Sequence, residues 1–277
     1  MEITLLGTGT SHGVPVIGCD CDVCLSRHPR NQRTRSSSYI SAGKTRILID
    51  TPPDLRTQLL REGINRVDAV LFTHAHADHL FGLDDVRTFN KLSGRPMRCY
   101  GTPHTLSVIR RVFDYAFGSL QIGGGIPQLD LIEVQVKTPL NNPETEIEGG
   151  ILQRNLVEVQ DTFDIDGISV MPVPVDHGRL SVLGYRIGNF AYVTDCNHIS
   201  DDSAKLLKNL DVLVLGVLRP KKLTTHFSLE QGIEVVDWLK PRRAIFTHTS
   251  HRMDYEAISK ILPPNVEFGY DGMKITC

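Results

Sequence analysis

The sequence carries almost no net charge. Its 277 residues include 30 lysines and arginines against 32 aspartates and glutamates, which gives a formal charge of −2. So small a charge produces no whole-molecule field that would collect nucleic acid or anionic lipid. We therefore expect no long nucleic acid as a partner, and any anionic substrate has to be held locally, by metal ions or a few placed cations.

From the sequence we also expect neither a leader nor a membrane-spanning segment. The chain begins Met1-Glu2-Ile3 with no basic segment ahead of an apolar segment and a cleavage site, and no apolar run is long enough to span a membrane. We therefore expect a cytoplasmic protein that does not engage a membrane. A hydrophobic content of 40% is typical of a globular chain, and this length allows a large core, in one big domain or two small ones.

Six cysteines could suggest a disulfide framework, but a chain of this length does not need one. Three of the six cysteines crowd into one short segment, as Cys19, Cys21 and Cys24. This crowding indicates a metal site, with a redox cluster as the alternative. The scattered remainder, Cys99 and Cys196 among them, is expected to pack as small hydrophobic residues.

Short apolar runs rich in β-branched residues alternate with segments of helical period, which predicts an α/β fold. Strands are expected at 2–6, 38–42, 45–50, 69–73, 97–100, 168–173, 182–187, 190–194, 211–216, 243–247 and 273–276. Capping residues and helix-ending glycine or proline predict helices at 54–62, 103–117, 200–207 and 229–240. The stretch 119–161 is rich in glycine, proline and acidic residues, so we expect it to be an insertion into a single domain spanning 1–277. It would serve as a substrate-side flap or as the contact of a homodimer.

The densest cluster of metal-competent side chains follows the predicted strand at 69–73. His74, His76, Asp78 and His79 stand within six positions. The two pairs lie on either side of a turn, so each pair can face a different ion. A chance cluster of solvated histidines is the alternative, and burying these groups without a cation would cost several kcal/mol.

Two ions need further ligands, and three later residues fit. His177, Asp195 and His248 each follow the carboxyl end of an apolar segment predicted as a strand. The loops at strand ends are where a layered α/β fold assembles its sites. Their shared placement makes all three candidate metal ligands.

With its His-x-His-x-Asp-His motif, the chain resembles the metallo-β-lactamase-fold hydrolases essentially from end to end. The resemblance implies a four-layer αββα sandwich. It also implies one ion held by His74, His76 and His177, a second held by Asp78, His79 and His248, and Asp195 bridging the two. Asp50 matches an early acidic position that orients the ligand histidines in this family; the alternative for Asp50 is a helix N-terminal acid near Asp54.

Further segments resemble one branch of this fold, the cyclic phosphate phosphodiesterases of the carbon-phosphorus lyase pathway and their relatives. The matching segments lie at 7–15, 18–24, 247–251 and 269–273. The resemblance implies a separate structural zinc held by Cys19, Cys21, Cys24 and His251. Such a Cys₃His set is a closed tetrahedral site that leaves no position for substrate.

Two residues are candidates for contact with a phosphate. His226 matches a histidine that the same branch places over the substrate phosphate, and the helix predicted after it favours anions. A hydrogen bond or proton from His226 to the phosphoryl group or its leaving oxygen would make it catalytic. Arg87, in the helical stretch beyond the metal loop, is the second candidate, and a local ion pair with Asp84 is its alternative.

These residues predict hydrolysis of a small, possibly cyclic or nucleotide-like phosphodiester. A hydroxide shared by two divalent ions, zinc or manganese, would attack phosphorus while Asp78 orients it. The rivals are an RNA-processing nuclease and a lactone or ester hydrolase of the same fold. A non-enzymatic metal-dependent binding module is a further alternative, and the complete ligand set argues against it.

Overall fold

The computed structural model describes residues 1–118, 125–135 and 162–277. Its first sheet is a mixed sheet that begins with antiparallel strands and continues in parallel from β3 to β6. Its strands, in spatial order, are β15 (Met273–Thr276), β1 (Glu2–Gly7), β2 (Ser37–Ala42), β3 (Thr45–Ile49), β4 (Ala69–Leu71), β5 (Met97–Gly101) and β6 (Leu129–Glu133).

The second sheet is mixed as well, with parallel pairing from β10 to β14 and antiparallel pairing from β10 to β7. Its strands, in spatial order, are β14 (Val266–Phe268), β13 (Arg243–Thr247), β11 (Val212–Arg219), β10 (Phe190–Val193), β9 (Leu180–Ile187), β8 (Ile168–His177) and β7 (Phe163–Ile165), with β12 (Phe227–Ser228) paired to β11.

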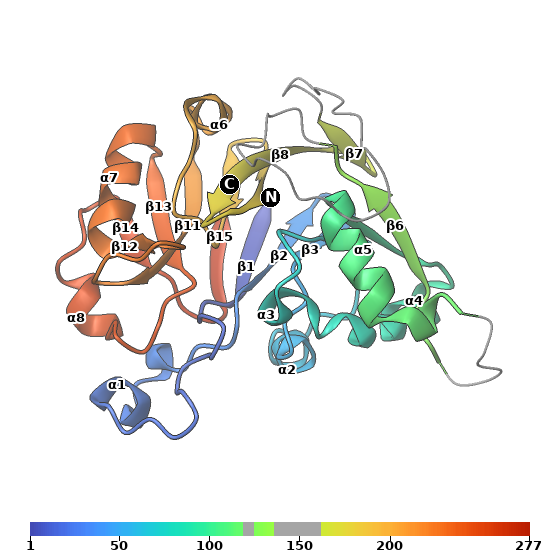
Figure 1. The fold of residues 1–277 in the computed structure, drawn as a ribbon, viewed down its shortest axis with the longest axis horizontal. Coiled ribbons are helices and arrows are strands. Elements are labelled where there is room, and N and C mark those ends of the chain that lie inside the picture. Colours follow the sequence, from blue (N-terminus) through green and yellow to red (C-terminus); the bar gives the residue numbers. More distant parts are fainter. Residues whose placement is uncertain (119–124, 136–161) are drawn as a thin grey trace.

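Helices cover the two outer faces, as Figure 1 shows for the groups on the right and left of the molecule. The first sheet is flanked by α2 (Leu55–Arg61), α3 (Ala77–Leu80), α4 (Arg87–Ser93) and α5 (Pro103–Val112). The second is flanked by α6 (Asp201–Leu206), α7 (Leu229–Leu239) and α8 (Tyr255–Ser259), while α1 (Asp22–Leu25) lies on a projection at the lower left. This is the expected four-layer αββα sandwich, so the predicted fold class is confirmed.

Three apolar clusters fill the spaces between the layers. The central one joins the inner faces of both sheets and includes Ile47 and Tyr192. The outer clusters pack each sheet against its own helices, with Val70 and Leu106 on one side and Val236 and Phe246 on the other. Burial on both faces explains why these strands read as continuous apolar runs in the sequence.

The expected strands and helices are all present, with shifted ends and some additions. The helix predicted over 103–117 ends at Val112, because Phe113 leaves helical geometry and a 3₁₀ turn follows at Asp114–Ala116. The strands β6, β7, β12 and β14 are additional to the prediction. Most of the expected insertion at 119–161 lies outside the described residues, although β6 falls within it, and the single-domain organisation stays a prediction.

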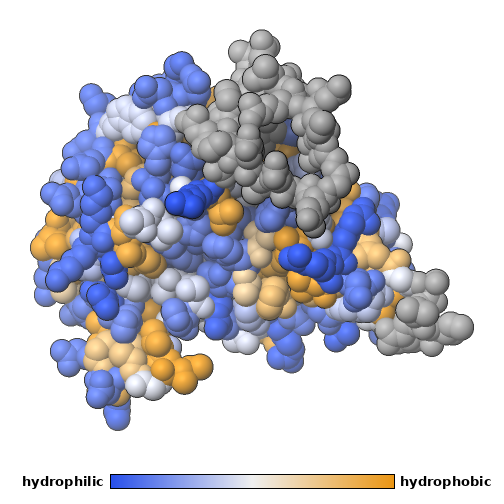
Figure 2. Space-filling view, in the orientation of Figure 1, coloured by the Kyte–Doolittle hydropathy of each residue, from blue (hydrophilic) through white to orange (hydrophobic). Residues whose placement is uncertain are grey.

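The surface in Figure 2 is mostly polar, with apolar side chains gathered on the projection that carries α1. Ile17 and Leu25 are strongly exposed there, at 98% and 68%. Across the described part of the chain, no helix has the length and apolarity needed to cross a bilayer. The homodimer expected from the sequence stays a prediction.

Candidate metal centre

The candidate ligands from distant parts of the chain meet at the carboxyl ends of the strands. His74 and His76 follow β4, and His177 ends β8; their ligand atoms lie within 4.8 Å of one another. A second group, with the same spread of 4.8 Å, consists of Asp78, His79, Asp195 and His248. The structure thus brings together all seven residues proposed from the sequence, divided as the resemblance implied.

Asp195 stands between the two groups. Its Oδ1 lies 3.3 Å from Nε2 of His79 and 3.2 Å from Nδ1 of His248. Its Oδ2 lies 4.0 Å from Nε2 of His74 and 3.3 Å from Nε2 of His226. The two carboxylate oxygens therefore face different groups, as a bridging ligand requires.

The hydrogen bonds around His74, His79 and His177 leave the Nε2 atoms of these three rings free for a metal. Nδ1 of His79 donates to Asp50 Oδ2 at 2.7 Å, and Nδ1 of His177 donates to the Thr225 carbonyl at 2.7 Å. Thr73 Oγ1 gives its own proton to Asp50 Oδ2, so it accepts from Nδ1 of His74 at 3.0 Å. A histidine whose Nδ1 donates carries its lone pair on Nε2.

Two of these Nε2 atoms are buried without a hydrogen bond, although carboxylate oxygens lie near both of them. Nε2 of His74 and Nε2 of His79 make no hydrogen bond, although both lie inside the protein. Buried polar atoms are rarely left unsatisfied, and an ion that ligates both groups would satisfy them. The donor set of imidazoles and carboxylates suits zinc or manganese, so the residues present fit divalent metals.

Charges in the centre are arranged for a cation. Burial and neighbouring charge lower the pKa of His74 well below its usual value, and burial lowers that of His248 to about 4, so both rings are neutral. Burial alone would raise the pKa of Asp195, but the surrounding histidines outweigh it, and the pKa stays well below the usual value. The same balance, with His79 as partner, lowers the pKa of Asp78. Neutral imidazoles and ionised carboxylates are the forms that bind metals, so a metal ion here would displace a proton from His79. Although burial lowers the pKa of His79, Asp195 and Asp50 raise it well above its usual value.

Three site residues have left-handed backbones. Asp50, Asp195 and His248 have φ angles of 60°, 50° and 57°, each directly after a strand or one residue beyond it. Non-glycine residues in this region carry strain that tends to gather at functional sites. The neighbouring β11 makes room, because a Cβ at Gly216 would come within 2.9 Å of the Asp195 nitrogen.

The cysteine cluster forms a second, separate group. Sγ of Cys19 lies 3.2 Å from Nδ1 of His251, and the Sγ atoms of Cys21 and Cys24 each lie 3.5 Å from it. Burial raises the pKa of the Cys24 thiol to about 11. A bound cation would supply the positive charge needed to hold this thiol as a ligating thiolate, so the four residues fit a tetrahedral metal site.

The two phosphate candidates differ in their surroundings. His226 lies beside Asp195, and its Nδ1 is 2.9 Å from Thr225 Oγ1, so it borders the metal centre. Arg87 begins α4 with Nη1 3.1 Å from Asp84 Oδ2, and half of its side chain is exposed. Its part in substrate binding stays a prediction.

Sequence reasoning missed the residues that orient the ligands. Thr73 and Thr225 fix histidine tautomers, Ser36 Oγ lies 3.1 Å from Nδ1 of His248, and Gly216 gives Asp195 its space. Thr73 and Thr225 adjoin His74 and His226 in the sequence, which is the one local signal that marks them. Ser36 and Gly216 carry no such signal.

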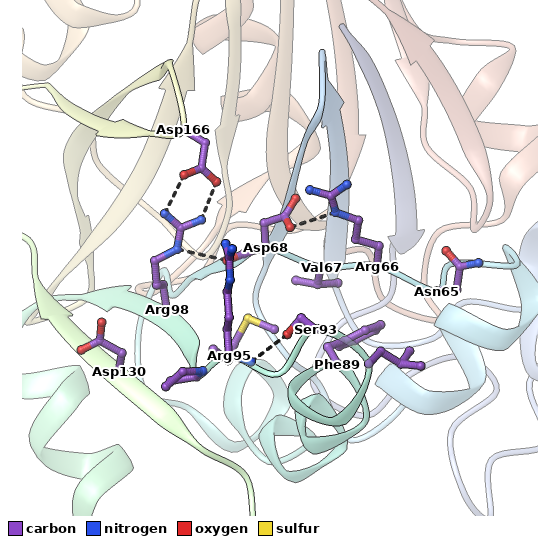
Figure 3. A pocket seen from close by; sticks show the side chains of 13 residues that line it. Asn65, Arg66, Val67, Asp68, Phe89, Ser93, Arg95, Arg98, Asp130 and Asp166 are labelled. Atoms are coloured by element: carbon purple, nitrogen blue, oxygen red, sulfur yellow. Dashed lines mark hydrogen bonds and ion pairs between the residues drawn. The ribbon is translucent and has the colours of Figure 1, made fainter.

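A cavity of about 990 Å³ lies away from this centre, at the amino ends of β4 and β5 (Figure 3). Two ion pairs border it: Arg98 with Asp166, at 2.6 Å, and Arg66 with Asp68, at 2.9 Å. Figure 3 shows the guanidinium of Arg98 facing the Asp166 carboxylate with two hydrogen bonds. None of the candidate metal ligands lines this cavity.

Fold and site together define a hydrolase of the metallo-β-lactamase fold. The model of the beta-lactamase superfamily domain matches residues 45–249. The chain belongs to this family, and the resemblance inferred from its motifs is confirmed.

The chain is also similar to individual proteins. It is 36% identical to a diphosphatase of the PhnP family, with a TM-score of 0.85 and coverage of 99% of this chain and 96% of that one. Zinc-bound PqqB from Methylobacterium extorquens shares the fold at 18% identity, with a TM-score of 0.76 and full coverage of both chains. A curated octanoyltransferase of Porphyromonas gingivalis is 37% identical over 99% of this chain, which spans 51% of that relative's length.

Proposed function

We propose that the chain is a dinuclear metal-dependent phosphodiesterase that hydrolyses a small, cyclic or nucleotide-like phosphodiester. The observation that carries the proposal is the placement of Asp195 between two ligand groups, with Nε2 of His226 3.3 Å from its Oδ2. A pair of bridged cations beside an imidazole suits a reaction that must neutralise phosphoryl oxygens and assist a leaving oxygen.

In this proposal His74, His76 and His177 hold one ion, and Asp78, His79 and His248 hold the other, with Asp195 shared. Bound there, two zinc or manganese ions supply an activated water and charge neutralisation at phosphorus. Asp50, fully buried, keeps the proton of His79 on Nδ1.

The remaining steps fall to the side chains. Asp78, ionised in this environment, accepts a hydrogen bond from the attacking water and orients it. His226 donates to the phosphoryl group or to the departing ester oxygen. Thr225 steadies that ring through the 2.9 Å contact with its Nδ1. Arg87 would add a cation to phosphate binding once it exchanges Asp84 for the substrate.

We further propose that Cys19, Cys21, Cys24 and His251 hold a structural zinc. The four ligand atoms lie within 4.8 Å of one another and come from opposite ends of the chain. A zinc there would pin the projection that carries α1 to the loop after β13, in which His248 lies three residues before His251.

A second candidate activity is hydrolysis of a phosphoanhydride. The observation that favours it is the 36% identity to a diphosphatase of the PhnP family over nearly the whole chain. The same metals and His226 would serve both reactions, because each displaces an oxygen leaving group from phosphorus. The name octanoyltransferase gives no comparable support, since about half of that relative lies outside the match.

One substrate panel tests these proposals. Cyclic nucleotides, cyclic sugar phosphates, a linear aryl phosphodiester, a nucleoside diphosphate, precursor RNA and a lactone are each incubated with added zinc or manganese. We expect turnover of the small phosphodiesters, at least tenfold above that of RNA and lactone. Preferred cleavage of the diphosphate would select the second candidate, and lactone cleavage without phosphodiester cleavage would refute both. Chelated protein is the matched control.

A further inference from the structure

Arg33 is a buried cation whose hydrogen-bond partners carry no charge. The side chain is only 1% exposed. Its donors reach the carbonyls of Arg30 at 3.2 Å, Ser250 at 3.1 Å and Met253 at 2.7 Å, and Asn31 Oδ1 at 2.8 Å. Every one of these acceptors is uncharged, and Arg33 forms no ion pair within the described ranges. An isolated buried charge is costly even when it is hydrogen-bonded.

The acceptors of Arg33 flank the histidine of the cysteine cluster. Ser250 lies one residue before His251 and Met253 two residues after it. The Arg33 guanidinium therefore donates hydrogen bonds to the backbone on both sides of His251. Burial lowers the pKa of Arg33 to about 10, while the charges of Asp271, Asp254 and Cys24 act in the opposite direction.

The carboxylates of Asp271 and Asp254 make their hydrogen bonds and ion pairs with residues other than Arg33. Asp271 pairs with Arg61 at 3.2 Å and accepts hydrogen bonds from Thr8 and Thr34, while Asp254 accepts from Asn31 and caps α8. Neither comes within ion-pair distance of the Arg33 guanidinium. Both carboxylates thus have other partners, and the cysteine cluster, through Cys24, is a further source of negative charge near Arg33.

The net charge of the zinc-loaded cysteine cluster is one that can balance the positive charge of Arg33. Three thiolates, a neutral imidazole and one divalent cation sum to a single negative charge. We propose, resting on the structural zinc proposed above, that Arg33 is the charge partner of the metal-loaded Cys19–Cys21–Cys24–His251 cluster and raises its affinity for zinc. Arg33 is thus a positioning residue: it touches no metal, but it holds the His251 segment and balances the cluster.

The proposal predicts how zinc affinity at the cysteine cluster differs among three variants. Arg33→Met keeps the apolar stem and removes the charge, so zinc affinity at the cluster falls about 10- to 100-fold, as for other partners of metal ligands. Arg33→Lys keeps the charge, so the affinity stays within about threefold of wild type on the same electrostatic reasoning. Arg252→Met is the matched control, because it removes an exposed, solvent-screened charge next to His251.

The experiment uses the full-length protein. Zinc retention is measured by competition with a chromogenic chelator, and the thiolate-to-cobalt absorption of the Co²⁺ form reports the cysteine cluster alone. Cys24→Ala marks the signal of a lost cluster. Thermal melts confirm folding, and where Arg33→Met fails to fold, Arg33→Gln replaces it, since its amide can still donate to the Ser250 or Met253 carbonyl.

The outcomes separate the two proposals. Weak retention in Arg33→Met, with Arg33→Lys and Arg252→Met near wild type, supports the charge-partner role. Equal retention in Arg33→Met and wild type overturns it and leaves the zinc proposal intact. Losses of equal size in Arg33→Met and Arg33→Lys also overturn it, since hydrogen bonding would then explain the effect. A wild-type protein without thiolate-to-cobalt absorption refutes the zinc site and this inference together.

Discussion

Exchanging Asp50 for asparagine should damage the metal centre more than removing the side chain altogether. Asp50 Oδ1 accepts from the Thr73 nitrogen at 2.8 Å, and Oδ2 accepts from Nδ1 of His79 at 2.7 Å. An asparagine must keep its oxygen toward the Thr73 N–H, which places its NH₂ against His79. Nδ1 of His79 must then accept, so the ring proton moves to Nε2 and blocks the metal.

The expected losses of zinc affinity follow from this change of the His79 tautomer. Loss of an outer partner weakens metal binding about 10- to 100-fold. We expect Asp50→Ala, which leaves His79 free to choose its tautomer, near the lower limit, and Asp50→Asn near the upper limit, a difference of about 1.4 kcal/mol. Stability should show the opposite order, because alanine leaves the buried Thr73 N–H unsatisfied, at a cost of about 1–3 kcal/mol.

Isothermal titration of the metal-free proteins with zinc measures the affinity of each active-site ion, and denaturant unfolding measures stability. Thr73→Ser, which keeps both donors to Asp50, is the control and should bind zinc like wild type. The tautomer argument is refuted if Asp50→Asn binds the ion held by His79 as tightly as wild type does, or as tightly as Asp50→Ala does.

Four further results are expected. His226→Ala should lower kcat about 10²- to 10⁴-fold with both active-site ions retained, as metal analysis would verify; unchanged turnover would remove its catalytic role. Rigorous chelation should abolish hydrolysis and zinc or manganese should restore it, whereas activity in verified metal-free protein would disprove the metal mechanism. Arg87→Ala should raise KM for phosphodiesters while kcat changes less, and an unchanged KM would reassign Arg87 to its pair with Asp84. Hydrogen bonds from Ala257 and Asn31 lower the pKa of Asp254 in the folded protein. The ionised Asp254 therefore stabilises the fold above its unfolded-state pKa of about 3.9, and this stabilisation is lost as the pH falls through the folded-state pKa. The difference in Tm between wild type and Asp254→Asn should close with acidification, and a difference that does not change with pH would contradict this.

Most of the candidate ligands could be found from the sequence because they stand at the end of an apolar strand or shortly after it. His177, Asp195 and His248 needed only strand prediction and ligand chemistry, and the loop from His74 to His79 carries a recognisable spacing. The carboxyl ends of β4, β8, β10 and β13 then meet where the two sheets face each other. The residues that only orient the ligands were not predicted, because a threonine or serine hydroxyl can make many different hydrogen bonds. Only the three-dimensional structure shows which partner it has.

Element ends and short strands were also beyond reach. The strands β12 and β14 have two and three residues, too few for an alternating pattern, and exist because β11 and β13 offer them an edge. The helix α4 has only seven residues and ends at Gly94 in the left-handed conformation. Tertiary pairing, not local propensity, decides elements of this size.

The sequence by itself determined the α/β class, the positions of most strands and the types of atom that face the metals, because burial imposes apolar periodicity and metal binding demands particular donors. Only the tertiary structure decided which nitrogen of His74 and His79 is free, which histidine each oxygen of Asp195 faces, and that Arg33 is buried beside the cysteine cluster. These features depend on distances of a few ångströms between residues far apart in the chain, and no local pattern of residues encodes them.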